Sequence, residues 1–560
     1  MNIKKLITGL LMSATLLAGF QMQAQDLPPI PKVEPAAPKN WHALDLATDG
    51  YFGISLNKAY GFLKGKKSKQ VTVATIDSGV DTLQKDLKDI LWTNPKEIPG
   101  NGKDDDHNGY IDDVHGWNFL GGPGAKCDFN ETTEEVREYA RLKDKWMLAR
   151  PSSPNDKAYK YWLRVQAVHD STVFKSRTEY DQLSPVMNIL VGTSALVKRE
   201  LHMGPNDVFT LKDLDRITTT NDTIKECKNA WTSFFTQEGP DSDNAKVIKD
   251  LNEYLTKLNN DLNPDLEARK NIVGDNPDVY TDKPGYGNNL LKWQDAMHGT
   301  MVAGFIAAKR NNGYGIDGVA DNVRIMAIKA VPNGDEYDKD IAHAIRYAVD
   351  NGAQIINMSF GKKISPHKQW VDDAMRYAAQ HDVLIVQAAG NDNANMDKEP
   401  SFPNTTADDG KPINISLIDV GASTAHKGES LPADFSNYGK NTVDVFAPGA
   451  KVTSVTNDGD TETEDGTSFA SPITAGIAAL ILEYYPNLSA RQIKAAILQS
   501  AKPLTGLMVS LPGDKDKKVD FTTLSRTGGV VNAYDALVAA SKMKGERKVS
   551  NVRNLDSDRK

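Results

Sequence analysis

The sequence predicts an α/β fold of three layers, in which a mostly parallel sheet has helices on both faces and is interrupted by a helical insertion. From residue 298 onward, β-branched apolar runs alternate with segments of helical period, as in parallel strands joined by crossover helices. Between residues 126 and 285 the segments are charged, poor in glycine and helical in period. We therefore expect this second region to be an inserted helical subdomain and not a linker.

The predicted strands and helices follow one another in a regular order. The first strand, at 71–77, reads VTVATID, an apolar run that ends in an acid, as a buried parallel strand does. Further strands are predicted at 323–331, 354–361 and 383–391, and helices at 337–353 and 368–382. Sites in such sheets form beyond the carboxyl ends of the strands. Asp77, Ser359, Gly361 and Asn391 all fall at those ends.

A further helix is predicted to begin near Ser468, in the segment DGTSFASPITAGIAALIL. From Ile473 to Leu482 nearly every residue is apolar, which is typical of a helix buried on all sides. Pro472 is expected within the first turn, where its missing N–H costs little. Ser468 is then either a simple helix cap or a hydroxyl at the positive end of a helix dipole, where negative charge is favoured.

The N-terminus and the composition limit the class of protein. Residues 1–24 combine two lysines, an apolar stretch and small residues, which is typical of a secretory signal peptide; an uncleaved membrane anchor is the alternative. We expect an exported protein, periplasmic or extracellular, without a membrane span once the signal is removed. The 66 basic and 74 acidic residues give a net charge of −8, which does not indicate a nucleic-acid partner. The oligomeric state stays open.

The predicted domain boundaries follow from these shifts in composition. They are a signal peptide at 1–24, a proline-rich linker and extension at 25–69, the main α/β domain at 70–125 and 286–545, the helical insertion at 126–285, and a polar tail at 546–560. The two cysteines, Cys127 and Cys227, fit an oxidising compartment. They form one disulfide or remain two buried thiols, and the sequence leaves both alternatives open.

Four short segments place candidate reactive side chains at strand ends or helix starts. Asp77 lies in ATIDSGVD, His298 in HGTMVAGFIAAK, Asn391 in AAGN and Ser468 in GTSFASP. Taken alone, each has a structural alternative, such as a turn residue or a helix N-terminal residue. Together the segments resemble the subtilisin-like serine peptidases, whose chain order of Asp, His and Ser is met here.

The resemblance implies a serine endopeptidase that acts on proteins or peptides through an acyl-enzyme intermediate. Ser468 is then the nucleophile, His298 the general base, and Asp77 the residue that orients the imidazole. Asn391 and the backbone amide of Ser468 are expected to stabilise the oxyanion. No cofactor is required for this chemistry. The alternatives are an exopeptidase of restricted access and an inactive relative used for binding or as a chaperone.

The resemblance also implies where substrate lies. Ser359, Phe360 and Gly361 are expected to pair with an extended peptide as an added strand, an ordinary sheet edge being the alternative. Ala389 and Gly390 are implied to line the same cleft.

The spacing along the chain departs from this family. Asp77 and His298 are 221 positions apart, whereas members of the family usually have a few dozen. We therefore expect the insertion to form a rim subdomain that restricts access, with decoration away from the cleft as the alternative.

An acidic segment, DDDHNGYIDD, carries a separate pattern. Asp104, Asp106 and Asn108 alternate and are followed by a glycine and Asp112, like the first part of an EF-hand calcium loop. The match ends at His115, which stands where the loop needs a bidentate glutamate. Nearby glycine and proline residues also argue against an incoming helix. A structural calcium site and a solvated acidic turn are both compatible with this segment.

Overall fold

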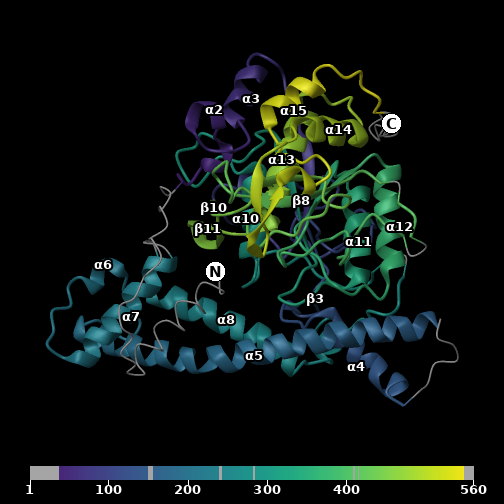
Figure 1. Ribbon diagram of the computed structural model, residues 1–560. Helices are drawn as coiled ribbons and strands as arrows, with labels where there is room; N and C mark the ends of the chain where they lie inside the picture. The colour runs from purple at the N-terminus through teal and green to yellow at the C-terminus, as the bar shows by residue number, and fades with distance from the viewer. Residues whose placement is uncertain are drawn as a thin grey trace. The chain divides into compact units, whose positions relative to one another are not determined.

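The computed structural model describes residues 37–148, 156–238, 242–281, 284–407, 410–413 and 415–547. Two units divide the chain, one at 37–138 and from 266 onward, the other at 139–265 (Figure 1). The predicted signal peptide, the first part of the predicted linker and the end of the predicted tail lie outside the described residues. Within the described ranges, no helix is both long enough and apolar enough to cross a membrane.

A seven-stranded sheet forms the centre of the larger unit, and every neighbouring pair of its strands is parallel. The spatial order is β2 (Gly116–Asn118), β5 (Val323–Lys329), β1 (Val71–Asp77), β6 (Ile355–Met358), β7 (Leu384–Ala388), β8 (Leu417–Ser423) and β9 (Val445–Pro448). Most residues of these strands are apolar and buried, because both faces of the sheet are covered. The predicted parallel sheet is confirmed.

Helices cover the two faces of this sheet and complete the three-layer α/β/α arrangement. On one face lie α10 (Met297–Ala307) and α13 (Thr467–Tyr484), which share an apolar core with α3 (Leu56–Leu63), α14 (Ala490–Ser500) and α15 (Ala533–Ala540). On the other face lie α11 (Asp338–Asp350) and α12 (Lys368–Gln380), with an apolar core of their own. Figure 1 shows α11 and α12 side by side, away from α10 and α13.

Shorter elements complete the larger unit. They are η1 (Trp41–Ala43), α2 (Leu46–Asp49), η2 (Lys88–Ile90), β3 (Gly121–Gly122), β4 (Lys126–Cys127), α9 (Ala268–Ile272), β10 (Val452–Val455), η3 (Asn457–Gly459), β11 (Thr461–Glu464), β12 (Met508–Leu511), β13 (Asp514–Asp520) and η4 (Phe521–Thr523). Trp41 and Ile54 are fully buried in the core beside α10, so the N-terminal extension from residue 37 is part of this unit.

Several predicted strands end earlier than the sequence indicates. The strand predicted at 383–391 stops at Ala388 because the chain turns at Gly390, whose φ of +102° is a left-handed conformation that only glycine adopts freely. The polar residue at the end of that prediction, Asn391, therefore lies in a loop beyond the sheet. This turn brings the side chain to the carboxyl edge, where a site can form.

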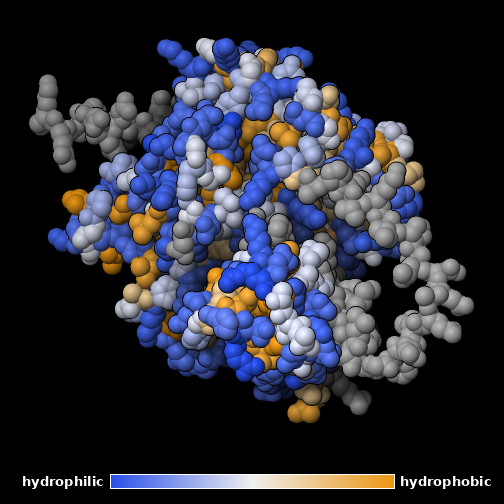
Figure 2. All heavy atoms as spheres, turned by 90° about the vertical axis from the view of Figure 1, so that its left-hand side faces the viewer, coloured by the Kyte–Doolittle hydropathy of each residue, from blue (hydrophilic) through white to orange (hydrophobic). Residues whose placement is uncertain are grey.

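The smaller unit consists of helices, as the charged, glycine-poor composition predicts. Its elements are α5 (Lys157–Glu200), α6 (Leu211–Leu214), α7 (Asp222–Glu238) and α8 (Asn244–Leu262), and α4 (Glu134–Trp146) runs from the larger unit into it. Trp231, Phe235 and Leu251 are fully buried in its own apolar core. Helix α5 also exposes Phe174 and Ile189. On the face drawn in Figure 2, hydrophobic spots lie between hydrophilic side chains.

The two cysteines are free and buried. The disulfide that the sequence left open is therefore not formed in this structure. Burial raises the pKa of the Cys127 thiol to about 11, and it also raises the pKa of Cys227. Both side chains therefore carry unreactive thiols at neutral pH.

Buried ion pairs hold the two chain segments that flank the smaller unit. Arg269 of α9 donates to both carboxylate oxygens of Asp340 in α11, at 2.6 and 2.9 Å, and also to Asp275. On the other flank, Glu134 lies 2.8 Å from Lys362, which follows β6. All of these side chains are buried, so each charge depends on its partner.

We expect Arg269→Met to destabilise the larger unit by about 3–5 kcal/mol, because it leaves Asp340 buried without its counter-charge, although Asp275 keeps Lys339. Urea denaturation followed by tryptophan fluorescence measures this loss. Lys270→Met is the matched control, because the neighbouring Lys270 forms only an exposed pair with Glu267. Equal midpoints for the two variants would contradict the assignment.

Candidate active site

The carboxyl end of β1 and the start of α10 bring Asp77 and His298 into contact. His298 Nδ1 lies 2.7 Å from Asp77 Oδ1, across 221 residues of chain. The Asp77 carboxylate is 2% exposed and also accepts a hydrogen bond from the backbone N–H of Ser78, whereas the His298 side chain is 36% exposed. A buried carboxylate therefore orients an imidazole that faces solvent in part.

Two glycines allow this approach. A Cβ on Gly299, the residue after His298, would lie 2.0 Å from the carbonyl oxygen of Gly79. Gly79 itself has a φ of +98°, and a Cβ there would lie 2.2 Å from the Leu291 carbonyl oxygen. The first turn of α10 can therefore contact the loop after Asp77 only when position 299 lacks a side chain, and the segment at Leu291 can approach that loop only when position 79 does.

A buried lysine also connects the loop after Asp77 to the segment before His298. Lys329, the last residue of β5, donates to the Ser78 carbonyl at 2.6 Å and to both oxygens of Asp295 at 2.7 Å. Asp295 lies three residues before His298, so this pair connects the loop after Asp77 to the start of α10. Sequence reasoning missed it. The available signal was a lysine after the apolar run 325–328 of a predicted buried strand, because a buried charge needs a partner.

The surroundings of His298 change its pKa in opposite directions. Burial is the largest effect and lowers it. The negative charge of Asp77, the hydrogen bond to Asp77 and the charge of Glu464 raise it and together prevail. The pKa of His298 therefore lies above its ordinary value of 6.5.

Ser468 is the second residue of α13. The helix is capped by Gly466 without a side-chain hydrogen bond, so Ser468 is not the helix cap that the sequence allowed. Its hydroxyl donates to the carbonyl of Ser359 at 3.2 Å, and no hydrogen bond joins it to His298 within the described residues. The next side chain, Phe469, packs beside the imidazole with ring centroids 5.5 Å apart. The first turn of α13 thus lies next to His298.

Pro472 is the sixth residue of α13, one turn later than predicted. Because proline has no N–H, the carbonyl of Ser468 lacks its helical hydrogen-bond donor. The hydroxyl of Ser359 takes that place and donates to the Ser468 carbonyl at 2.8 Å. The carboxyl end of β6 is therefore fastened to the start of α13.

The side chain of Asn391 is oriented by Thr467. The backbone N–H and the hydroxyl of Thr467 both donate to Asn391 Oδ1 at 2.9 Å. With its oxygen engaged, the amide presents its NH₂ group as a donor. Thr467, which is buried, also accepts from the Gly390 N–H at 3.0 Å. Sequence reasoning did not identify Thr467, because its role depends on a contact between segments 76 residues apart.

The remaining predicted substrate positions lie around the same sheet edge. Phe360 is buried and Gly361 is exposed, directly after β6. The carbonyl of Ala389 accepts from Asn437 Nδ2, and the carbonyl of Gly390 accepts from the Asn437 N–H, both at 2.9 Å. These two carbonyls are thus used to shape the loop before Asn391.

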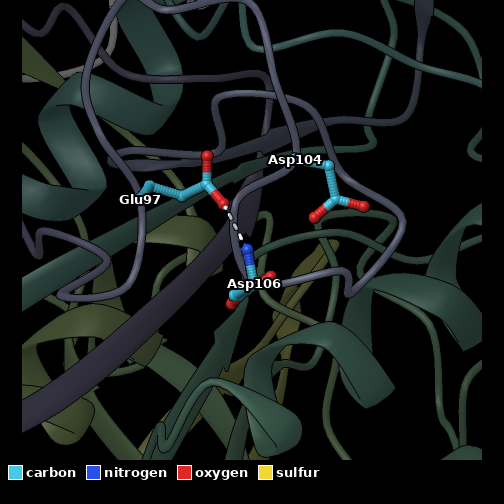
Figure 3. Close-up of side chains that lie close together, drawn as sticks. All are labelled: Glu97, Asp104 and Asp106. Carbon is cyan, nitrogen blue, oxygen red and sulfur yellow. Dashed lines mark hydrogen bonds between the residues drawn. The ribbon is translucent and has the colours of Figure 1, made fainter.

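The acidic segment forms a second cluster of polar side chains, in the loop before β2. Oxygen atoms of Glu97, Asp104 and Asp106 lie within 4.8 Å of one another (Figure 3). Glu97 Oε1 accepts from the backbone N–H of Asp106 at 3.3 Å, and Asp104 Oδ2 accepts from Gly109 at 2.8 Å. The structure thus brings together two of the four predicted metal ligands and adds Glu97, which the sequence pattern did not include.

The other two predicted ligands are used differently. The Asp112 carboxylate accepts from the backbone amides of Gly100 and Gly102, at 2.9 and 2.6 Å. Asn108 donates through its side chain to Asp113 at 3.2 Å and accepts from the backbone of Tyr110. The side chains of Asp112 and Asn108 therefore do not belong to the three-carboxylate cluster. Their hydrogen bonds shape the loop that carries the cluster.

Comparison with known proteins gives one family. The model of the subtilase family matches residues 68–530. A thermophilic serine proteinase of Bacillus sp. (strain AK1) is 39% identical over 211 residues, which cover 37% of this chain and 48% of that protein. Subtilisin DY of Bacillus licheniformis is 39% identical over 211 residues, 37% of this chain and 71% of that protein.

The cell wall-associated protease of Bacillus subtilis (strain 168) is 32% identical over 237 residues, 42% of this chain and 24% of that protein. The chain thus spans about half the length of the first of these relatives, the strain AK1 proteinase. The range that the family model matches includes β1, α10, the loop after β7 and α13, which carry Asp77, His298, Asn391 and Ser468 in that order. On this match, over most of its length, the chain belongs to the subtilase family.

Proposed function

We propose that this chain is an exported serine endopeptidase in which Asp77, His298 and Ser468 act as a catalytic triad. The observation that carries the proposal is the 2.7 Å contact between His298 Nδ1 and the buried carboxylate of Asp77. A buried acid that fixes one nitrogen of a partly exposed imidazole is the arrangement that a general base requires. Membership of the subtilase family and the names of the relatives support the same reaction.

The chemistry is acyl transfer. The Ser468 hydroxyl attacks the carbonyl carbon of a peptide bond as its proton passes to His298, and the charge of Asp77 stabilises the imidazolium that results. His298 then returns the proton to the leaving amine, and water releases the acyl group by the reverse steps. Attack requires the Ser468 hydroxyl to turn from the Ser359 carbonyl toward His298, a rotation about a single side-chain bond.

Asn391 and the start of α13 are placed to stabilise the oxyanion. Thr467 holds the Asn391 amide by its oxygen, so the NH₂ group is the donor. The backbone N–H of Ser468 lies at the N-terminus of an 18-residue helix, where amides lack helical partners and the dipole favours negative charge. Two donors at one edge match the needs of a tetrahedral intermediate.

Substrate is expected along the segment after β6. Gly361 forms no backbone hydrogen bond within the described residues, and it is exposed. An extended peptide can pair with this backbone as an added strand, with Phe360 as an apolar wall. Ala389 and Gly390, whose carbonyls are held by Asn437, form the opposite wall.

Export rests on the pattern of residues 1–24, which combine a charged start with an apolar stretch. One relative is named a cell wall-associated protease, which supports a location outside the cytoplasm. The destination is the periplasm or the extracellular space.

We expect Ser468→Ala to lower peptidase activity by about 10⁶-fold, because the nucleophile is removed while the fold is retained. Cleavage of a denatured protein substrate measures the loss, and a fluorophosphonate probe should label the wild-type chain at Ser468 alone. Ser541→Ala is the control, because its hydroxyl only caps the carbonyl of Val538 at the surface.

The fragments distinguish the possible activities. Internal fragments identified by mass spectrometry support an endopeptidase, and stepwise loss from one end indicates an exopeptidase of restricted access. Absence of both cleavage and probe labelling in a folded wild-type chain would falsify the proposal and indicate an inactive relative.

The rate should depend on pH through His298. The neutral imidazole is the active form, and its pKa is raised above 6.5, so kcat/KM should fall as the pH drops through a value above 6.5. Glu464→Gln removes one of the charges that raise this pKa, so it should shift the acidic limb to lower pH. Glu546→Gln, a surface residue paired with Arg491, should leave the limb unchanged. A Glu464→Gln profile that coincides with the wild type contradicts this assignment.

Replacement of Asn391 tests the oxyanion donor. We expect Asn391→Ala to lower kcat by about 10²–10³-fold with KM little changed, because the amide acts on charge that develops only in the transition state. Steady-state kinetics on a peptide substrate separate the two constants. A rise in KM at constant kcat would instead indicate a residue that binds the ground state.

A further inference from the structure

We propose that Lys362 and Glu134 close the substrate groove, so that the chain has no pocket for the side chain of the fourth residue before the cut. This inference rests on the proposed function and extends it to the selection of substrates. Its basis is the position directly after Gly361, where a buried lysine and two buried acids occupy the space that such a pocket would need.

The backbone after β6 determines which edge faces the substrate. Lys362 exchanges two backbone hydrogen bonds with Phe402, at 3.0 and 2.9 Å. Consecutive residues of an extended chain present their backbone groups to opposite edges, so the N–H and the carbonyl of Gly361 face away from Phe402. The carbonyl of Ser359, two residues earlier, accepts from the Ser468 hydroxyl. The edge along Ser359 and Gly361 is therefore the one at which a peptide can pair beside the nucleophile.

The register of that peptide follows from the position of the nucleophile. A peptide that runs antiparallel to this edge, with the residue before the cut beside Ser359, places its third residue opposite Gly361 and its fourth opposite Lys362. Side chains of directly opposite residues lie on the same face of a sheet. The fourth side chain of the substrate is therefore directed to the face on which the Lys362 side chain lies.

Ion pairs fill this face. The Lys362 side chain is 2% exposed, and its Nζ lies 2.8 Å from Glu134 and 2.9 Å from Asp338. The same Nζ donates to the carbonyl of Glu336 at 2.7 Å. The cavity that remains beside Lys362 and Ile341 has a volume of about 10 Å³, which is about enough for one water molecule. The side chain of a leucine or a phenylalanine therefore does not fit there.

The start of the predicted insertion supplies one of these acids and is itself fixed to the sheet domain. The carbonyls of Phe129 and Thr132 accept from backbone N–H groups of the loop after β5, those of Asn333 and Asp335, at 2.8 and 3.2 Å. The Asp335 carboxylate accepts from the N–H of Glu134 at 2.9 Å. This part of the insertion belongs to the larger unit. It thus holds Glu134 at the end of the groove.

A series of acetylated peptides tests the proposal on the wild-type chain. A site cleaved in a denatured protein supplies the parent sequence, and the fourth residue before the cut is then glycine, alanine, leucine or phenylalanine. We expect kcat/KM to vary by less than about threefold, whereas an apolar pocket would favour leucine or phenylalanine by about 10- to 150-fold. In a second series, shortened from the amino end, kcat/KM should fall on loss of the third residue but not of the fourth.

A double variant should create the missing pocket. Lys362→Ala with Asp338→Asn removes the lysine side chain and a charge that it balances, while Glu134 keeps Arg137 at 3.0 Å. We expect this variant to favour phenylalanine over glycine at the fourth position by about tenfold or more, because an apolar side chain can then be buried. Lys363→Ala is the matched control, because this exposed neighbour points to the opposite face, and it should behave as the wild type does.

The outcomes separate this inference from the proposed function. A wild-type preference of about tenfold or more for leucine or phenylalanine at the fourth position would overturn the inference and leave the peptidase function standing. A double variant that is folded by its thermal unfolding curve and still shows no preference would also overturn it. If that variant does not fold, the wild-type series decides. If no peptide is cleaved and Ser468 is not labelled, the proposed function fails and this inference fails with it.

Discussion

The hydrogen bond between Asp77 and His298 sets the main constraint on this chain. It requires two segments 221 residues apart to meet at the carboxyl edge of β1, although a helical unit is inserted between them. The chain must therefore leave the sheet domain and return to it at a fixed place. Buried pairs hold both flanks of the insertion, Arg269 with Asp340 on one side and Glu134 with Lys362 on the other. Because a buried charge without its partner is costly, these pairs favour the one closure that brings His298 back to Asp77.

The start of α13 shows how the sheet edge positions the proposed nucleophile. Pro472 withdraws a helical donor from the Ser468 carbonyl, and Ser359 at the end of β6 supplies another. Pro472 removes one hydrogen bond from the helix, and the Ser468 carbonyl that loses this donor is bonded to the sheet through Ser359 instead. Thr467 connects the start of α13 to the loop after β7, because its backbone N–H and its hydroxyl both donate to Asn391. A proline inside a helix is locally unfavourable, and here contacts with other segments compensate for it, as is common at functional sites.

Much of the fold could be predicted because it depends on local patterns. The strand predicted at 71–77 has the bounds of β1, and the helix predicted at 368–382 begins where α12 begins, since apolar periodicity and flanking polar residues define both. The order of the motifs likewise indicated which residues stand at the sheet edge. The contributions of Thr467 and Glu97 could not be predicted, because each depends on a contact that no spacing encodes. The helix predicted to begin near Ser468 begins at Thr467, and this small shift places Pro472 in the second turn, since helix starts are weakly marked in sequence.

Among the described residues, several carboxylates have a buried oxygen without a hydrogen-bond donor, and two of these oxygens are Oδ2 of Asp77 and Oε2 of Glu97. Their surroundings differ in sign. Asp77 contacts an imidazole whose protonated form it stabilises, and Lys329 lies behind the loop that follows it. In the proposed mechanism, the charge of Asp77 is used when His298 takes a proton. Glu97 faces two further acids, and no protonatable base contacts it within the described residues. The Asp77 carboxylate thus lies beside a group that can become its counter-charge, whereas the Glu97 carboxylate lies beside further negative charge.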